Sequence, residues 1–306
     1  MKRTPHITYI LTVLLVILLS SCFENNFVAC PPEDTGVRVH FTYDIQGEAS
    51  EIDRISLFVF DGQGILIGLH EETDVVMTPE YNISLPLDAG NYRFVVWANL
   101  RDCYNYTNCT INKTTFSNLE LYLQKEEDNT VRNAPHPLFH GWQEEAVITG
   151  DANQHFSIPL QRNTNTIQIQ TSGLPPTDTE YELAISDYNG HYTFENSFAS
   201  DTEEIHYISS CTKDEQSQLC ASLTVLRLAA DRKQPILRIR KKTPLRSEEV
   251  LYQANLVDLI LKLQEKDPTL TFENTHEYNF LLKFDTDLNV TVGINGWEIT
   301  ENVTEI

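Results

Sequence analysis

The feature that most constrains this sequence is a long series of short apolar segments separated by turn signals. In residues 37–43 apolar and polar side chains alternate, which is the period of a β-strand. Residues 55–60 form a more continuous apolar run, and the turn signal at 61–64 leads to a hairpin partner at 65–69. The sequence has no regular alternation of strand and helix patterns. It therefore predicts an all-β chain built mainly from antiparallel sandwiches.

Further strands are expected along the whole chain. They fall at residues 83–87, 92–97, 147–148, 156–160, 167–171, 181–186, 191–194, 222–228, 236–240, 278–284 and 290–294. Residues 251–266 have helical spacing of apolar residues instead and end before Pro268, and residues 119–126 are a candidate for a second, shorter helix. The sequence thus predicts a mainly β fold with a minor helix near 251–266.

The chain is long enough for two domains. The polar run 162–165 separates two expected strands, and we place a domain boundary there. This gives an N-terminal β-sandwich over residues 36–162 and a C-terminal β-sandwich over residues 163–306. Both lengths are ordinary for a single domain.

The N-terminal segment has the character of a lipoprotein leader. Two basic residues precede an uncharged run, 7–21, that is shorter than the about 20 apolar residues needed by a bilayer-spanning helix. The run ends in Leu-Ser-Ser followed by Cys22, which resembles a bacterial lipobox. We expect residues 1–21 to be a signal peptide, Cys22 to be lipidated and residues 22–35 to form a tether. The alternative is an ordinary secretory signal with a chance cysteine at its end.

Five cysteines remain beyond Cys22, and a lipoprotein faces an oxidising space in which disulfide bonds form. Cys103 and Cys109 would close a small loop, and so would Cys211 and Cys220. Cys30 with Cys103 is a competing pair. Because five is odd, at least one thiol stays unpaired or pairs between chains. The sequence has no Cys-x-x-Cys motif, so it gives no support for a zinc site.

The chain is strongly acidic. It has 44 acidic and 22 basic residues, a formal net charge of −22, and loss of Lys2 and Arg3 with the leader would make this −24. Nucleic acid is excluded as a partner, because binding it requires clustered Lys and Arg. The apolar content of 41%, with 10% aromatic residues, excludes a disordered acidic chain.

The basic residues are concentrated in one place. Seven of the 22 fall within 15 positions with no acid between them: Arg232, Lys233, Arg238, Arg240, Lys241, Lys242 and Arg246. One interpretation is an exposed strand face with Leu237 and Ile239 directed inward. The other is a docking patch, made by Arg238, Arg240 and Lys242, for an acidic partner subunit or an anionic lipid surface.

Motifs for catalysis are missing from the sequence. There is no Gly-x-Ser-x-Gly, no His-Glu-x-x-His and no phosphate-binding loop. We therefore predict no enzyme activity, no catalytic residue, no metal, and no cofactor apart from the covalent lipid on Cys22.

The order of motifs along the chain resembles that of a known family. The motifs are the lipobox, Cys30, the strand 37–43, the run 55–61, the segment 88–99 that contains Trp97-Ala98-Asn99, the segments 139–141 and 160–167, and Ile294-Asn295-Gly296-Trp297. This order is similar to that of the anchor lipoproteins of Bacteroidetes-type (type V) fimbriae. Ala98 departs from the pattern, because glycine is expected there, and residues 197–220 carry no matching motif.

The resemblance implies two tandem transthyretin-like antiparallel β-sandwich domains and no catalysis. It implies a lipoprotein, anchored in the cell outer membrane and exposed at the surface, that holds the base of a fimbrium. Such a protein binds the fimbrial shaft subunit and limits the length of the fimbrium. Subunits of this family polymerise by donor-strand exchange, in which a strand of one subunit completes the sheet of another.

In polymerising subunits of the family a protease removes the N-terminal strand and opens a groove. Here no Arg or Lys lies between Cys22 and Val37, and cleavage at Arg38 would cut inside the first strand. We therefore expect residues 37–43 to stay in place, so that the groove stays shut and growth stops at this subunit.

The C-terminal strands are candidates for contact with a partner subunit. Residues 290–294 and 297–303 alternate and lie close to the end of the chain. They would act as donor or docking strands through Val290, Val292, Ile294 and Trp297. The alternative is an ordinary last hairpin of the second domain.

A surface glycan-binding lipoprotein is the competing function. It shares the lipid anchor, the sandwiches and the aromatic residues with the fimbrial anchor. The loop 103–109 would present its tyrosines for stacking on sugars, although such a loop is also compatible with a purely structural role. The candidate stacking residues are Tyr104, Tyr106, Trp142 and Trp297.

Overall fold

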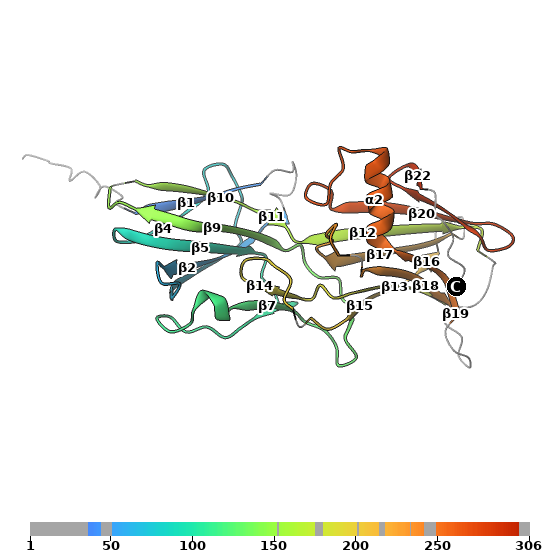
Figure 1. The fold of residues 1–306 in the computed structure, drawn as a ribbon, viewed down its shortest axis with the longest axis horizontal. Helices are drawn as coiled ribbons and strands as arrows, with labels where there is room; N and C mark the ends of the chain where they lie inside the picture. The colour runs from blue at the N-terminus through green and yellow to red at the C-terminus, as the bar shows by residue number, and fades with distance from the viewer. Residues whose placement is uncertain are drawn as a thin grey trace, which may run out of the picture. The chain divides into compact units, whose positions relative to one another are not determined.

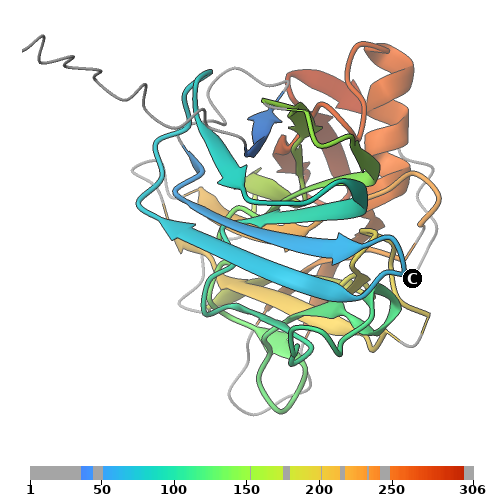
Figure 2. The same cartoon turned by 90° about the vertical axis from the view of Figure 1, so that its left-hand side faces the viewer.

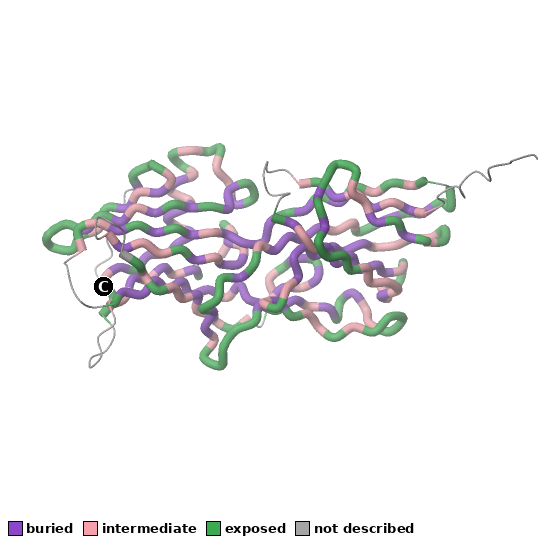
Figure 3. Tube along the Cα trace, turned by 180° about the vertical axis from the view of Figure 1, so that it is seen from behind, coloured by how far each residue is buried: buried purple, intermediate pink, exposed green. Residues whose placement is uncertain are grey.

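The computed structural model of the chain describes residues 36–43, 51–151, 153–174, 180–200, 202–213, 218–232, 234–241 and 249–299. The chain divides into two units, Met1–Thr35 and Gly36–Ile306, and all described residues belong to the second. The predicted leader, Cys22 and Cys30 lie outside the described residues. Buried residues run along the strands, and the loops are mostly exposed (Figure 3).

Short strands make up the N-terminal half of the described chain (Figure 1). They are β1 (Val37–Thr42), β2 (Arg54–Asp61), β3 (Leu66–Thr73), β4 (Asn82–Leu85), β5 (Gly90–Ala98), β6 (Tyr104–Tyr106), β7 (Glu120–Leu123), β8 (Thr130–Val131), β9 (Phe139–Ile148), β10 (His155–Pro159) and β11 (Gln161–Arg162). The hairpin predicted around residues 61–64 is confirmed: β2 and β3 pair antiparallel and lie side by side at the front of Figure 2.

Two sheets built from these strands enclose a first core. One has the strand order β11-β9-β5-β2-β3, and the other has the order β10-β1-β4. The β2 residues Ile55, Leu57 and Val59 are buried in this core, together with Val39 and Phe41 of β1. Alternation of apolar residues along β1 therefore reflects one buried face and one exposed face.

The opposite face of β2 is covered as well. Phe58 and Phe60 point into a second core, which also contains residues of a small sheet with the order β14-β7-β6. The Phe58 ring makes edge-to-face contacts with Tyr106 at 5.5 Å and with Phe194 at 4.8 Å between ring centroids. Because both faces of β2 are covered, its apolar residues form a continuous run and do not alternate.

Two larger sheets form the C-terminal half. The strands are β12 (Thr164–Ser172), β13 (Tyr181–Asp187), β14 (His191–Thr193), β15 (Ile205–Ser210), β16 (Thr212–Lys213), β17 (Leu219–Leu226), β18 (Ile236–Lys241), β19 (Glu249–Asn255), β20 (Glu277–Phe284), β21 (Val290–Ile294) and β22 (Trp297–Ile299). One sheet has the order β16-β17-β12-β20-β21-β22, and the other has the order β19-β18-β13-β15-β8. Their apolar faces and the helix α2 (Leu256–Lys266) share the second core.

The two halves exchange short strands. β8, from the N-terminal half, pairs with β15 in parallel, with Tyr207 opposite Val131. In return β14 pairs antiparallel with β7, with Tyr192 opposite Leu121. The second core therefore extends over residues from both halves.

The polar run 162–165, used above to divide the chain, is buried. Asn163 and Asn196 bond to each other through their side-chain amides. The Asn165 side chain accepts a hydrogen bond from Leu228 N at 2.9 Å and donates one to Thr275 O at 3.3 Å. The Asn165 amide thus serves as an internal partner for backbone groups, and the Asn163 and Asn196 amides satisfy each other. The boundary at this run stays a prediction, since Gly36–Ile306 forms one unit.

The helix predictions are only partly right. The sequence predicts a helix at residues 251–266, but α2 begins at Leu256, five residues later. The Asn255 side chain caps this start by accepting a hydrogen bond from Asp258 N at 3.0 Å. The residues before Asn255 belong to β19. The predicted helix 119–126 is wrong: a 3₁₀ turn, Phe116–Asn118, precedes strand β7, in which buried and exposed residues alternate. Among the described residues, no helix has the length and apolar character needed to cross a membrane.

Candidate functional site: the groove held by the first strand

Strand β1 occupies the middle of its three-stranded sheet. It pairs in parallel with β10 and antiparallel with β4, so that Val39 lies between Phe156 and Ile83. At its ends Arg38 N donates to Gln154 O at 2.8 Å and Leu160 N donates to Thr42 O at 2.6 Å. Without β1, strands β10 and β4 would both have an unpaired backbone edge facing an empty slot.

The inward side of β1 is apolar. Val37, Val39 and Phe41 are buried in the first core, and the ring of Phe41 contacts that of Tyr81 at 5.8 Å between centroids. Burying each such side chain contributes about 1.5–3 kcal/mol. β1 therefore fills a groove that would otherwise expose apolar surface and unpaired backbone.

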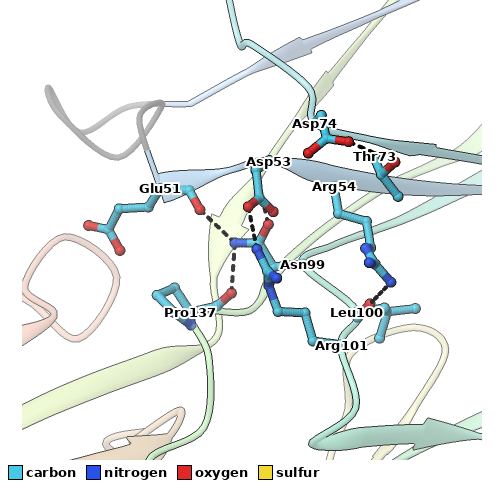
Figure 4. Close-up of polar contacts among 9 residues, drawn as sticks. All are labelled: Glu51, Asp53, Arg54, Thr73, Asp74, Asn99, Leu100, Arg101 and Pro137. Carbon is cyan, nitrogen blue, oxygen red and sulfur yellow. Dashed lines mark hydrogen bonds and ion pairs between the residues drawn. The ribbon is translucent and has the colours of Figure 1, made fainter.

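Just before β2, a set of hydrogen bonds made by the Asn99 side chain, called the Asn99 clasp below, holds the chain in place (Figure 4). The side-chain amide donates to Glu51 O at 2.8 Å and to Pro137 O at 3.0 Å, and its carbonyl oxygen accepts from Asp53 N at 3.1 Å. Asn99 is 1% exposed and has a φ of 63°, a left-handed conformation that asparagine tolerates better than most residues. Arg101 forms an ion pair with Asp53 beside this clasp.

At the other end of the chain, β22 is an edge strand. Val292 and Ile294 of β21 are buried, and β21 pairs with β20 on one side and β22 on the other. Val290 is partly buried, whereas Trp297 is 44% exposed. Of the four candidate contact residues at this end, Trp297 is thus the most accessible.

The basic cluster of the sequence is divided in the structure. Arg238 and Arg240 lie on the outer side of β18 and are partly buried, and Lys242 lies outside the described residues. Arg238 donates to the Ser186 hydroxyl at 2.6 Å and to the side-chain Oε1 of Gln253 at 2.8 Å. Burial, together with the charge of Arg240, lowers the pKa of Arg238.

Two further observations show that this patch is less basic than the sequence suggests. Arg240 lies directly opposite the buried Glu182 on β13, so the patch contains a negative charge as well. Arg232, which is close to it in sequence, instead lines a cleft with Arg162 and Arg227. This convergence of arginines has no signal in the sequence, because the three residues have no common spacing or motif.

The loop of Cys103 and Cys109 turns its tyrosines inward. Tyr104 is 6% exposed and bonds through its hydroxyl to His136 O, and Tyr106 packs on Phe58. This arrangement leaves the two rings poorly placed for stacking on a sugar. Burial raises the pKa of both thiols of the loop.

The second cysteine pair lies on a hairpin. Cys220 is opposite Thr212, the residue that follows Cys211. Burial, followed by the charge of Glu182, raises the pKa of the Cys211 thiol to about 11. Cys103, Cys109 and Cys211 are free thiols in the structure. The disulfide pairings stay predictions.

Residues 28–303 match the sequence profile of the family described as fimbrillin-A associated anchor proteins Mfa1 and Mfa2. The chain belongs to this family. Within it, the chain is 24% identical over 305 residues to the minor fimbrium anchoring subunit Mfa2 of Porphyromonas gingivalis, covering 92% of this chain and 90% of the relative. The resemblance inferred from the order of motifs is confirmed.

Solved structures support the fold of this Mfa2-family chain. The fimbrial anchor protein Mfa2 from P. gingivalis superposes with a TM-score of 0.71 at 22% identity, over 86% of this chain and 98% of that chain. A proposed polysaccharide-binding protein from Bacteroides thetaiotaomicron gives a TM-score of 0.75 at 24% identity, over 87% and 98%. The predicted fold class, a mainly β chain with a minor helix, is confirmed.

Proposed function

We propose that this chain is the non-catalytic anchor subunit at the base of a fimbrium and that it terminates growth of the fimbrium. Membership of the anchor family and the relation to an anchoring subunit support the anchoring role. The observation that carries the termination is β1, which lies paired on both sides in the groove. We place the protein at the cell surface, held in the outer membrane by a lipid on Cys22.

A closed groove ends growth for a physical reason. An incoming donor strand from another subunit would have to displace β1 from both of its neighbours and from the core. β1 is part of the same chain, so it competes at the effective concentration of an intramolecular segment, which is of order millimolar for short links. A separate subunit at lower concentration therefore does not enter, and no subunit is added on this side.

Contact with the shaft subunit would then use the other end of the chain. β22 is the edge of its sheet and carries the exposed Trp297, so it can pair with a strand of a partner. We propose that β22 and residues 300–303 form the donor or docking strand, while β21 holds β22 in place. The patch of Arg238, Arg240 and Lys242 is a second proposed contact, for an acidic partner or anionic lipid.

Attachment is tested by replacing the proposed lipidation site. In cells carrying Cys22→Ala, fimbriae should be shed into the medium, and incorporation of a clickable fatty acid into the protein should disappear. Cys30→Ala is the matched control, because it removes a nearby cysteine and should leave labelling and attachment intact. Attached fimbriae together with a labelled Cys22→Ala protein would contradict the proposal.

The basic patch is tested separately by charge reversal. The variant Arg238→Glu/Arg240→Glu/Lys242→Glu should lose co-purification of the shaft subunit or retention on the cell surface. Its thermal unfolding must first match that of the wild type, because Arg238 bonds to Ser186 and Gln253 within the sheet. Unchanged assembly and retention in a folded variant would remove the patch from the proposal.

A further inference from the structure

A cleft of about 930 Å³ lies beside β11 and shares Pro159 and Leu160 with the end of the β1 groove. Its walls come from the start of β9, the end of β10, the loop after β14 and the segment after β17. This volume is in the range of pockets that bind small organic ligands. The lining combines cations, amides, carboxylates and the aromatic residues Trp142 and Phe198.

Two of the cleft arginines form no salt bridge with a described residue, although the charge of Arg232 acts on the buried Asp187. Arg162 is paired with Glu51 at 3.1 Å. Arg227 donates to the backbone oxygen of Asn196 at 2.9 Å, and Arg232 donates to that of Tyr188 at 2.8 Å. Within the described part of the chain, neither Arg227 nor Arg232 forms a salt bridge, and the Nε–H group of each is buried without an acceptor. Since a guanidinium has five N–H donors, both retain bonding capacity.

One aromatic ring brings these two cations together. The guanidinium carbon of Arg232 lies 4.0 Å from the centroid of the Phe198 ring, and that of Arg227 lies 4.8 Å from it. Two like charges at one ring repel each other where they are partly buried. A carboxylate within reach of both would offset this repulsion and accept charge-assisted hydrogen bonds from them.

The other ionisable groups of the cleft narrow the choice of ligand. His140 and His276 are buried, and burial lowers the pKa of His140 to about 3 and that of His276 to about 4, so both are neutral at pH 7. Exposed carboxylates stand at the rim: Glu195, Asp231 and Glu273. They would repel a dense polyanion but can accept hydrogen bonds from hydroxyl groups.

A ligand with one carboxylate, several hydroxyls and an apolar ring face matches this lining. The partly buried Trp142 offers a ring for such a face and lies parallel to Phe116, with 6.5 Å between ring centroids. A peptide strand fits less well, because the sheet edge at the cleft is β11, which has only two residues. We propose that the cleft binds a hexuronic acid unit of an acidic saccharide, with its carboxylate held by Arg227 and Arg232.

The test is a calorimetric titration of the detergent-solubilised full protein with trigalacturonate. Its methyl ester is the matched ligand, because it has the same shape without the charges. We expect saturable binding of the acid and at least tenfold weaker binding of the ester. Arg227→Gln and Arg232→Gln should each weaken binding of the acid by about tenfold or more, as expected for loss of a charged hydrogen bond. Arg132→Gln, at an exposed ion pair outside the cleft, should not.

Several results would overturn the proposal. They are no binding of the acid, equal binding of acid and ester, or equal binding of the acid and an oligoglutamate peptide. Unchanged affinity in both folded arginine variants would also overturn it. If a glutamine variant does not fold, hydrogen exchange of the wild-type protein decides: trigalacturonate must protect the backbone around Phe198, and absence of protection contradicts the site. None of these results depends on fimbrial attachment, so the anchoring role is tested independently.

Discussion

The Asn99 side chain joins backbone segments that are distant in the sequence. It bonds to backbone groups of Glu51, Asp53 and Pro137, all of them distant in sequence. The sequence displays Trp97-Ala98-Asn99 as a motif but gives no indication of these partners. The partners of Asn99 are backbone groups that lie 38 to 48 positions away in the sequence, so its role becomes visible only when the fold brings them together.

Asn99→Ala should destabilise the protein by about 3 kcal/mol or more, because it leaves buried backbone groups without partners. Part of the effect would come from the left-handed backbone, and Asn112→Ala is the matched control for that part. Asn112 is exposed and has a φ of 62°, but it makes no side-chain hydrogen bond within the described chain. We expect its variant to lose about 1 kcal/mol. Equal losses in urea unfolding of the two variants would contradict the role of the clasp.

His140 should make the protein sensitive to acid. Its ring is buried, and Nε2 donates to Phe194 O at 3.0 Å. Burial lowers its pKa to about 3 in the folded protein, against 6.5 for an unperturbed histidine. Between these values the unfolded chain binds a proton that the folded chain does not, so stability falls as pH falls, by about 1.4 kcal/mol per pH unit.

Other buried groups also affect the stability of the fold in this pH range. His276, whose pKa is lowered to about 4, acts in the same direction as His140. Asp187 opposes them between about pH 6 and 3.8, since burial raises its pKa to about 6 and the folded state then binds the proton more tightly. Comparing the wild type with His140→Asn isolates one residue. Between pH 6.5 and 4.5, the free energy of unfolding of the variant, measured in urea, should depend less steeply on pH than that of the wild type. The expected difference in slope is about 1.4 kcal/mol per pH unit, and identical slopes would contradict this.

At the scale of elements, alternation of apolar and polar residues identifies strands with one buried face. Alternation places β1 correctly, because Val37, Val39 and Phe41 are inside and the residues between them are not. The helix predicted at residues 119–126 overlooks the same alternation, because Leu119, Leu121 and Leu123 are buried from a strand and its lead-in. The start of α2 was missed because its position depends on a capping side chain, not on apolar spacing.

Phe41→Ala should loosen β1 in its groove. Removing a buried aromatic ring costs about 3 kcal/mol or more, which should appear as faster hydrogen exchange of the β1 amides. Thr42→Ala is the matched control, because the neighbouring Thr42 is exposed on the same strand. Fimbriae on cells with Phe41→Ala should also be longer, since a donor strand can then compete. Unchanged exchange and unchanged length would contradict the role of β1 in termination.

The C-terminal edge is tested by two deletions. Removing residues 300–306 should leave β21 and β22 paired but abolish attachment of the shaft subunit. Removing residues 295–306 takes β22 away as well, and with it the strand that pairs with β21 through Val292 and Ile299. Both strains should lack attached fimbriae. Recovery of full-length, cell-attached fimbriae from either strain would exclude that segment as the donor or docking strand.

At the scale of the whole molecule, the sequence indicates the family and the sandwich architecture but not how the halves combine. β8 and β14 each pair with strands of the other half, and neither is long enough to carry a pattern. The cleft has the same origin: Arg162, Arg227 and Arg232 come from separate segments and meet only in the fold. Contacts between distant segments depend on topology, which local periodicity does not encode.

Closure of the groove by the protein's own first strand is central to the proposed mechanism. The most direct measurement is the mass and N-terminal sequence of this chain after isolation from assembled, cell-attached fimbriae. We expect a chain that starts at a lipidated Cys22 and continues without a break through Val37–Thr42. A chain that starts at Val39 or later would show that the strand had been removed, and would contradict the account.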